Sequence, residues 1–326
     1  MRRIDVQGRS LKARLDAERG RVLSCMSDDL DLLQAPDRHS PRPLDLAGEH
    51  PMAVSFPTPT DERDNMLQQE GMIEKIRELC GRDERAVALL MYGSFALAKG
   101  DRFSDIEFYL FFVDEALDGL EEEAWVSQIA PLELYYVNEF GNGTAIFENL
   151  VRGEFHFEAA SNVGLVDTWE TAWFPSLGSS VLVDKTGELS RRVSRLVRHP
   201  PDLDTPERAL FLCCSLINWT LMGTNLLKRG EYARAEAFLT LVQGHLLQAM
   251  RLVEGKTANW LSPARRLEED ATASSYERFR ACTAALEGEQ LVRAYTSTWE
   301  WSRELMGELA TRHAFALPQT LLDKLS

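Results

Sequence analysis

The chain has 326 residues, of which 44% are hydrophobic and 27% charged, and its formal net charge is -15. These proportions are typical of a soluble globular protein with enough apolar residues for about two domains. Binding of nucleic acid without sequence preference needs clustered Lys and Arg, so the acidic balance argues against that class. It leaves nucleotide substrates open and weakly favours a cationic small molecule as a partner.

The cysteines and the apolar segments restrict the class further. The five cysteines contain no CxxC pair, so the sequence does not support a zinc site, and we expect buried, reduced thiols. By inspection, no stretch is long and apolar enough to cross a bilayer, and the N-terminus lacks the apolar core of a secretory signal. We therefore expect a cytoplasmic protein with no membrane partner.

Residues 1–65 differ from the rest of the chain. They hold six of the thirteen prolines and show little periodic apolar pattern beyond a short helix expected near Leu11 to Leu33. This composition predicts a poorly ordered N-terminal extension. We expect that it is not part of the functional enzyme and that Met66 is an alternative start.

Residues 66–200 mix helical and strand patterns. Apolar residues such as Met72, Ile76 and Cys80 recur at helical spacing. "AVALLMYGSF" predicts a buried strand that runs into a turn, and further strands are expected in "SDIEFYLFFV", "LELYYVNEF", "TAIFENL", "GEFHFEA" and "SSVLVD". Helices are expected around residues 120–128 and 189–197. Residues 201–326 carry long helical patterns and predict an up-and-down helical domain.

A Gly-Ser pair and an acidic pair stand close together in the first of these regions. Gly93 and Ser94 follow an apolar strand, and ten residues separate Ser94 from the sequence Asp105-Ile106-Glu107. Alternate residues of a strand point to one face, so we expect Asp105 and Glu107 side by side, surrounded by apolar neighbours. Such a pair needs a compensating cation, and Mg²⁺ is usually held by one or two carboxylates plus substrate phosphates. Backbone N–H groups of the Gly-Ser turn would seat a terminal phosphate.

Four blocks in order carry a specific resemblance: "MYGSF", "SDIEFY", "NLVRGEFHF" and "LMGTNLLKRGEYAR". Together they resemble the lincosamide nucleotidyltransferases of the LinB type, within the nucleotidyltransferase superfamily that includes DNA polymerase beta. The resemblance covers about residues 66–326. It implies an α+β fold: a nucleotidyltransferase catalytic domain in residues 66–200, with a mixed β-sheet and flanking helices, and an all-α bundle in residues 201–326.

The resemblance also implies an activity. Such enzymes transfer a nucleoside monophosphate from ATP or another NTP to a hydroxyl of lincomycin or clindamycin, and pyrophosphate leaves. The resemblance implies two Mg²⁺ ions, bound by Asp105, Glu107 and Glu154. It also implies that Glu154 is the catalytic base. Gly93, Ser94, Lys228 and Arg234 would bind the nucleotide, with Arg152 as a further candidate. The implied substrates are a lincosamide and an NTP. No nucleic-acid partner is expected, and the resemblance favours a homodimer.

Several alternatives stay open at this point. His156 lies on the same strand face as Glu154 and competes with it for the role of base. The same chemistry on an aminoglycoside is the nearest rival function. Other classes are a protein-modifying nucleotidyltransferase of a toxin–antitoxin pair and a non-catalytic binding module. Most aromatic residues of the helical region are expected in the core, with one or two at a drug pocket between the domains: Trp219, Tyr232, Trp260, Trp299 and Trp301.

Overall fold

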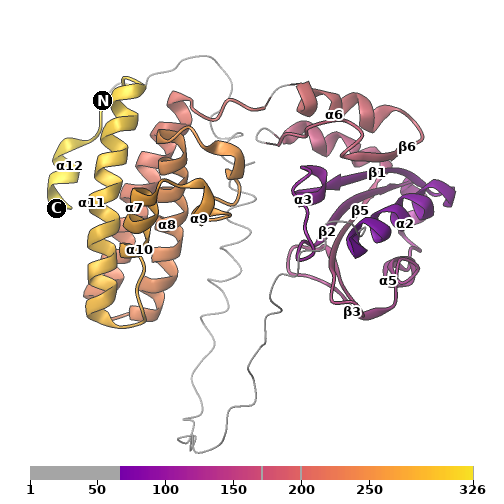
Figure 1. The fold of residues 1–326 in the computed structure, drawn as a ribbon, viewed down its shortest axis with the longest axis horizontal. Helices are drawn as coiled ribbons and strands as arrows, with labels where there is room; N and C mark the ends of the chain where they lie inside the picture. The colour runs from indigo at the N-terminus through magenta and orange to yellow at the C-terminus, as the bar shows by residue number, and fades with distance from the viewer. Residues whose placement is uncertain (1–66, 170–171, 199, 326) are drawn as a thin grey trace, which may run out of the picture. The chain divides into compact units, whose positions relative to one another are not determined.

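The computed structural model describes residues 67–169, 172–198 and 200–325. The expectations for residues 1–65, and for Met66 as a start, therefore lie outside the described residues. The chain divides into two compact units, each described by itself (Figure 1). Among described residues, the first unit holds 67–169 and 174–198, and the second holds 172–173 and 200–325.

The first unit has the expected α+β composition. Its strands are β1 (Ala86–Tyr92), β2 (Ile106–Phe112), β3 (Leu132–Val137), β4 (Gly143–Phe147), β5 (Arg152–Ala159) and β6 (Val181–Asp184). Its helices are α2 (Gln68–Arg82), α3 (Gly93–Ala96), α4 (Asp114–Leu117), α5 (Glu122–Val126), the 3₁₀ segment η2 (Ala160–Thr168) and α6 (Glu188–Arg198). The strands and helices predicted from periodicity in residues 66–200 are all present.

The six strands form one mixed sheet in the order β3-β4-β5-β2-β1-β6. Only β2 and β5 pair in parallel, and the other neighbours are antiparallel. In Figure 1, β6 and β3 accordingly lie at opposite edges of the sheet. The register sets Glu107 of β2 opposite both Tyr92 of β1 and Glu154 of β5. Three strands distant in sequence thus bring polar residues together at the centre of the sheet.

The two faces of the sheet differ in character. One face carries the fully buried Phe108, Leu110 and Phe112 of β2, and Trp125 of α5 packs edge-on against Phe112. The opposite face carries Glu107, next to Glu154 of β5. Phe108, Leu110 and Phe112 therefore do not surround the acidic pair, because strand alternation turns them to the other face. On the face of Glu107, which we call the polar face, polar side chains gather at the end near Tyr92 and Glu107, whereas Phe111, near the other end of β2, is buried.

The second unit is helical, as predicted. Its elements are α7 (Pro206–Lys228), α8 (Tyr232–Val253), η3 (Thr257–Asn259), α9 (Leu267–Asp270), α10 (Ala273–Ala281), α11 (Gly288–Arg312) and α12 (Gln319–Lys324). Helix α7 begins at Pro206 after Thr205, whose side chain accepts a hydrogen bond from the Arg208 N–H. Proline in the first turn and Thr before it are favoured there, because the first N–H groups have no partner inside the helix. Gly230, at φ 74°, separates α7 from α8.

Helix α7 corrects one expectation from the sequence. By length and composition α7 is apolar enough to cross a membrane, contrary to our expectation that the sequence contains no such stretch. Its buried residues include Leu212, Leu216 and Ile217, which belong to the main core cluster of the second unit. A core helix of a soluble protein passes the same test, so the finding is weak evidence for a membrane span.

Three tryptophans and two cysteines belong to the main core cluster of the second unit. Trp260, Trp299 and Trp301 are buried, whereas Tyr232 is exposed. Of the cysteines, Cys80, Cys213 and Cys282 are buried and Cys214 is exposed, and all four are free thiols. The expectation of buried thiols was wrong for Cys214, which lies on the outer face of α7, and Cys25 lies outside the described residues.

Candidate active site on the polar face of the sheet

The turn after β1 brings the backbone close to an acidic side chain. Gly93 has φ 72°, in the region that favours glycine. A Cβ atom added at Gly93 would lie 1.5 Å from Oε2 of Glu107. The glycine therefore serves two purposes: it permits the turn, and it lets the chain pass directly against the Glu107 carboxylate.

Ser94 lies next in this turn and is buried, with 4% of its surface exposed. Its Oγ atom finds no hydrogen-bond partner in the part of the chain that the structure describes. A buried hydroxyl without a partner costs free energy, so such an atom is a candidate contact for a ligand. The helix that follows, α3, spans only Gly93–Ala96. A single turn makes a weak dipole, so any attraction for phosphate at this turn rests on Ser94 and the backbone N–H groups.

Two of the predicted acidic residues share one cation. Arg152 begins β5, and its Nη1 atom lies 2.7 Å from Oδ2 of Asp105, just before β2. Its Nη2 atom lies 2.7 Å from Oε2 of Glu154. The parallel pairing of Ile106 with Gly153 produces this arrangement, because it sets the start of β5 beside the start of β2. The guanidinium thus bridges two carboxylates from different strands.

Glu154 is the centre of a hydrogen-bond network. Besides Arg152, it accepts a bond of 2.8 Å from the Tyr92 hydroxyl, and Nε2 of His156 lies 3.2 Å from its Oε1 atom. His156 Nε2 also lies 2.8 Å from the Tyr92 hydroxyl. The bonds with His156, Arg152 and Tyr92 outweigh partial burial and lower the pKa of Glu154 to about 2. Glu154 is therefore an anion at neutral pH, as both a metal ligand and a proton acceptor must be.

Aromatic rings line the network on the same face. Tyr109 stacks on His156 with ring centroids 4.0 Å apart, and the ring centroids of Trp169 and Tyr109 lie 5.2 Å apart. Burial, together with the negative charges of Glu154 and Glu107, raises the pKa of Tyr92. Tyr92 consequently stays protonated and can act as a hydrogen-bond donor that fixes Glu154.

The residues suit a magnesium ion in chemistry, although they are not assembled as a three-ligand cage. Among the described residues, no group of three or more His, Cys, Asp or Glu side chains is arranged to hold a metal. Magnesium, however, is commonly held by one or two carboxylates together with substrate phosphates. A cationic guanidinium already lies between Asp105 and Glu154. The oxygen donors and the cation position therefore fit Mg²⁺, and the predicted set of Asp105, Glu107 and Glu154 stays a prediction.

The other predicted nucleotide ligands lie in the second unit. Lys228 ends α7 and is exposed. Arg234, in the first turn of α8, lies 2.9 Å from Glu231. Lys228 also lines a cleft of about 1010 Å³ on one flank of the helical unit, together with Trp299 and two threonines, Thr220 and Thr224. Within the described residues, the buried Thr220 Oγ1 and Trp299 Nε1 atoms find no hydrogen-bond partner.

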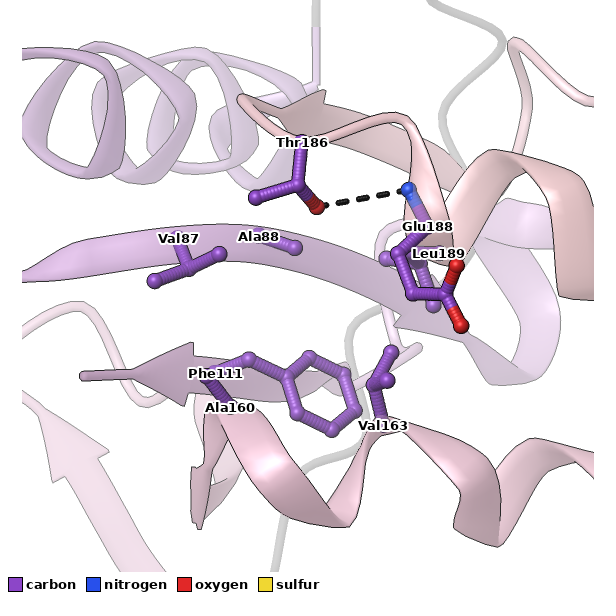
Figure 2. A pocket seen from close by; sticks show the side chains of 8 residues that line it. All are labelled: Val87, Ala88, Phe111, Ala160, Val163, Thr186, Glu188 and Leu189. Carbon is purple, nitrogen blue, oxygen red and sulfur yellow. Dashed lines mark hydrogen bonds between the residues drawn. The ribbon is translucent and has the colours of Figure 1, made fainter. Parts of the chain in front are cut away.

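A smaller cavity of about 180 Å³ lies elsewhere in the first unit (Figure 2). Ala88 and Phe111 line it, and they lie on the same sheet face as Glu107. The register places them four residues along the strands from Tyr92 and Glu107, or about 13 Å at the usual rise per residue. The lining is mainly apolar, with Thr186 accepting a bond from the Glu188 N–H. This cavity is separate from the acidic cluster.

Sequence reasoning found most of this cluster but missed two contacts. Tyr92 was not singled out, although it directly precedes Gly93. Arg152 was considered for phosphate, whereas the structure places it against Asp105 and Glu154. The available signal was its spacing, because Arg152, Glu154 and His156 alternate along one strand and so share a face.

Comparison with known proteins gives one family match, to the C-terminal region, and two distantly similar structures. Residues 205–326 match the family model described as "Lincosamide nucleotidyltransferase-like, C-terminal domain". We find no match among curated proteins. The chain is similar to the crystal structure of an aminoglycoside 6-adenyltransferase from Bacillus subtilis, with 12% identity, 80% of this chain and 99% of that chain covered, and a TM-score of 0.36. A nucleotidyltransferase-like protein from Exiguobacterium sibiricum shows 12% identity, coverages of 75% and 78%, and a TM-score of 0.34. The part of the chain that matches the lincosamide nucleotidyltransferase-like (LinB-like) family is therefore its helical C-terminal region, residues 205–326.

Proposed function

We propose that the chain inactivates a lincosamide by Mg²⁺-dependent transfer of AMP from ATP to a hydroxyl of the drug, with release of pyrophosphate. The observation that carries this proposal is the acidic cluster beside the glycine turn. Gly93 lies directly against Glu107, and the Arg152 guanidinium lies between the carboxylates of Asp105 and Glu154. A nucleotidyl transfer site needs such a cation position next to backbone groups that can receive phosphate.

The residues of the acidic cluster and of the glycine turn would have different roles. Asp105, Glu107 and Glu154 would hold the divalent ions, and Gly93 and Ser94 would receive the phosphates. When bound, Mg²⁺ neutralises phosphate charge and stabilises the leaving pyrophosphate. Loss of either carboxylate of the acidic pair should lower turnover by about 10²-fold or more, because charge stabilisation is usually the largest contribution to such a reaction.

The transfer itself is a displacement at the α-phosphorus. The drug oxygen forms the new P–O bond, the bond to the bridging oxygen of pyrophosphate breaks, and the hydroxyl proton passes to a base. We assign that base to Glu154. Its three hydrogen-bond donors make it a weak proton acceptor as it stands. It must therefore exchange at least one of these donors for the substrate before it can act.

His156 is the alternative base. Its Nε2 atom contacts the Tyr92 hydroxyl at 2.8 Å and the Glu154 carboxylate at 3.2 Å. A structural imidazole would hold Glu154 in place through the same contacts. The two roles separate in a pH–rate profile, because loss of a base removes the acidic limb and loss of a positioning group does not.

Lys228 and Arg234 are proposed ligands of the triphosphate. They are cations near the junction of α7 and α8, and Arg234 already pairs with the Glu231 carboxylate. Lys228→Gln should raise the KM for ATP more than that for the drug, measured against Arg229→Gln as a neighbouring exposed control. A cytoplasmic location and a homodimer complete the proposal.

One assay tests the function directly. The protein is incubated with Mg²⁺, ATP labelled in the α-phosphate, and separate lincosamides, aminoglycosides and macrolides. We expect a labelled AMP adduct with lincomycin or clindamycin. An adduct with an aminoglycoside alone would transfer the assignment to the rival drug class, and the absence of any adduct would refute the proposal.

A further inference from the structure

The most informative feature beyond the proposed reaction is the position of the Arg152 guanidinium. It lies 2.7 Å from an oxygen of Asp105 and 2.7 Å from an oxygen of Glu154. Both carboxylates are proposed ligands of the divalent ion. The guanidinium therefore lies between the same two anions that the ion would join.

The contacts of Arg152 fix its guanidinium in one position. Its two terminal nitrogens donate hydrogen bonds to different carboxylates, and hydrogen bonds between two charged groups are about twice as strong as neutral ones. Glu154 is held from its other side by Tyr92 and His156, and only 20% of its side chain is exposed. Arg152 in turn starts a central strand, and its backbone is fixed by pairing with Ile146 of β4. The Arg152 guanidinium thus lies between the two carboxylates, and its backbone is held in the sheet.

We propose that Arg152 is a built-in counter-cation that occupies the metal position of the nucleotide-free enzyme, so that a divalent ion binds only by displacing its guanidinium. The inference rests on the proposed function, since it concerns the same metal position. Arg152 is a positioning residue here: its guanidinium lies between Asp105 and Glu154 until the nucleotide arrives.

The consequence concerns the order of binding. Without nucleotide, a metal ion must compete with a cation that is covalently tethered at the site and is present at high local concentration. With nucleotide, the phosphates supply additional ligands for the ion and a new anionic partner for the displaced guanidinium, which pairs readily with phosphate. Metal binding is therefore weak alone and strong in the presence of the triphosphate.

Binding of Mn²⁺ to the full chain, followed by electron paramagnetic resonance of the free ion, tests this inference without nucleotide and without turnover. In Arg152→Gln we expect Mn²⁺ to bind at least about tenfold more tightly than in the wild type, because displacing one charge-assisted hydrogen bond costs about that factor. Arg152→Lys, which keeps the charge but loses the forked geometry, should lie between the two.

Two controls make the result specific. Arg85→Gln removes a guanidinium that pairs with Asp83 ahead of β1, and it should leave Mn²⁺ affinity unchanged. Combining Arg152→Gln with Asp105→Asn should abolish the gain, since the freed carboxylate is then missing. In thermal unfolding, Mn²⁺ should stabilise Arg152→Gln more than the wild type, a readout that a merely destabilised variant would not show.

The outcomes separate this inference from the proposed function. Equal or weaker Mn²⁺ binding in Arg152→Gln and Arg152→Lys, with binding still present, would overturn the role of Arg152 alone. If no variant bound Mn²⁺ even with the ATP analogue α,β-methylene-ATP, the metal position itself would fail, and the proposed function with it.

Discussion

Gly93 is the residue at which turn geometry and site chemistry meet. It adopts φ 72°, and a Cβ atom there would lie 1.5 Å from the Glu107 carboxylate. Gly93→Ala should therefore displace Glu107 as well as strain the turn, and we expect turnover to fall by about 10²-fold or more, in line with loss of an electrostatic contact. Turnover under saturating ATP and drug checks this prediction.

Gly141 supplies the matched control for that substitution. It has φ 79° in the hairpin between β3 and β4, and an added Cβ would meet no atom within 4 Å. Both alanine variants incur the left-handed backbone cost of about 1–3 kcal/mol. Only Gly93→Ala should also lose activity, so equal activity in the two variants would show that the approach to Glu107 is unimportant.

Glu154 and His156 are separated by paired substitutions. Glu154→Gln keeps the shape but removes the carboxylate that we assign as the base, and we expect turnover to fall by about 10²- to 10⁴-fold. Nucleotide binding, measured by calorimetry with α,β-methylene-ATP, should survive. His156→Gln should cost less and should keep the acidic limb of the pH–rate profile. Near-normal turnover in Glu154→Gln would reject that residue as the base.

Residue patterns predicted this site only in part. The alternation of Asp105 with Glu107, and of Arg152, Glu154 and His156, was enough to place each group on one face of its strand. The contact between the groups depends on the parallel pairing of β2 with β5 and on its register. Because nothing local in either strand encodes that register, the Arg152 bridge could not be derived from spacing alone.

At the scale of elements, Asp184 joins strand β6 to helix α6. Its carboxylate accepts bonds from the N–H groups of Gly187 at 2.8 Å and Ser190 at 2.7 Å, and from Thr186 at 3.2 Å. Burial opposes ionisation, but these bonds outweigh it and lower the pKa of Asp184. The sequence "VDKTGELS" thus encodes both the end of the strand and the start of the helix.

This contact makes stability depend on pH in a defined direction. Because the folded-state pKa of Asp184 lies below the ordinary value of 3.8, its contribution is complete above that value and is lost as pH falls through the folded pKa. Asp184→Ala should cost about 0.5–2 kcal/mol at neutral pH, as for loss of a helix cap. Urea unfolding at pH 7 and pH 3 should show the difference shrinking in acid, whereas the exposed Asp118→Ala should show little effect at either pH. A difference that grew in acid would contradict this account.

At the scale of the whole molecule, the question is what kind of helix α7 is. Its length and composition would suit a membrane span, but hydropathy does not report which residues face a protein core. The structure adds that information: Leu216 is fully buried, whereas Leu221, also in α7, is 38% exposed. The existence of the helix followed from periodicity, and its place in the core followed only from the packing of α8 and α11 against it.

The pair Leu216 and Leu221 therefore distinguishes a core helix from a membrane span. Leu216→Asp places a carboxylate without a partner in the core, at a cost of several kcal/mol, and we expect the protein to unfold or become insoluble. Leu221→Asp should purify without detergent and melt within about 2 °C of the wild type, because exposed substitutions usually change stability by less than about 0.5 kcal/mol. Circular dichroism melting of both variants measures this. A helix surrounded by lipid would penalise the two charges alike, since both lie far from its ends, so equal loss of the two proteins would contradict the assignment of α7 to the core.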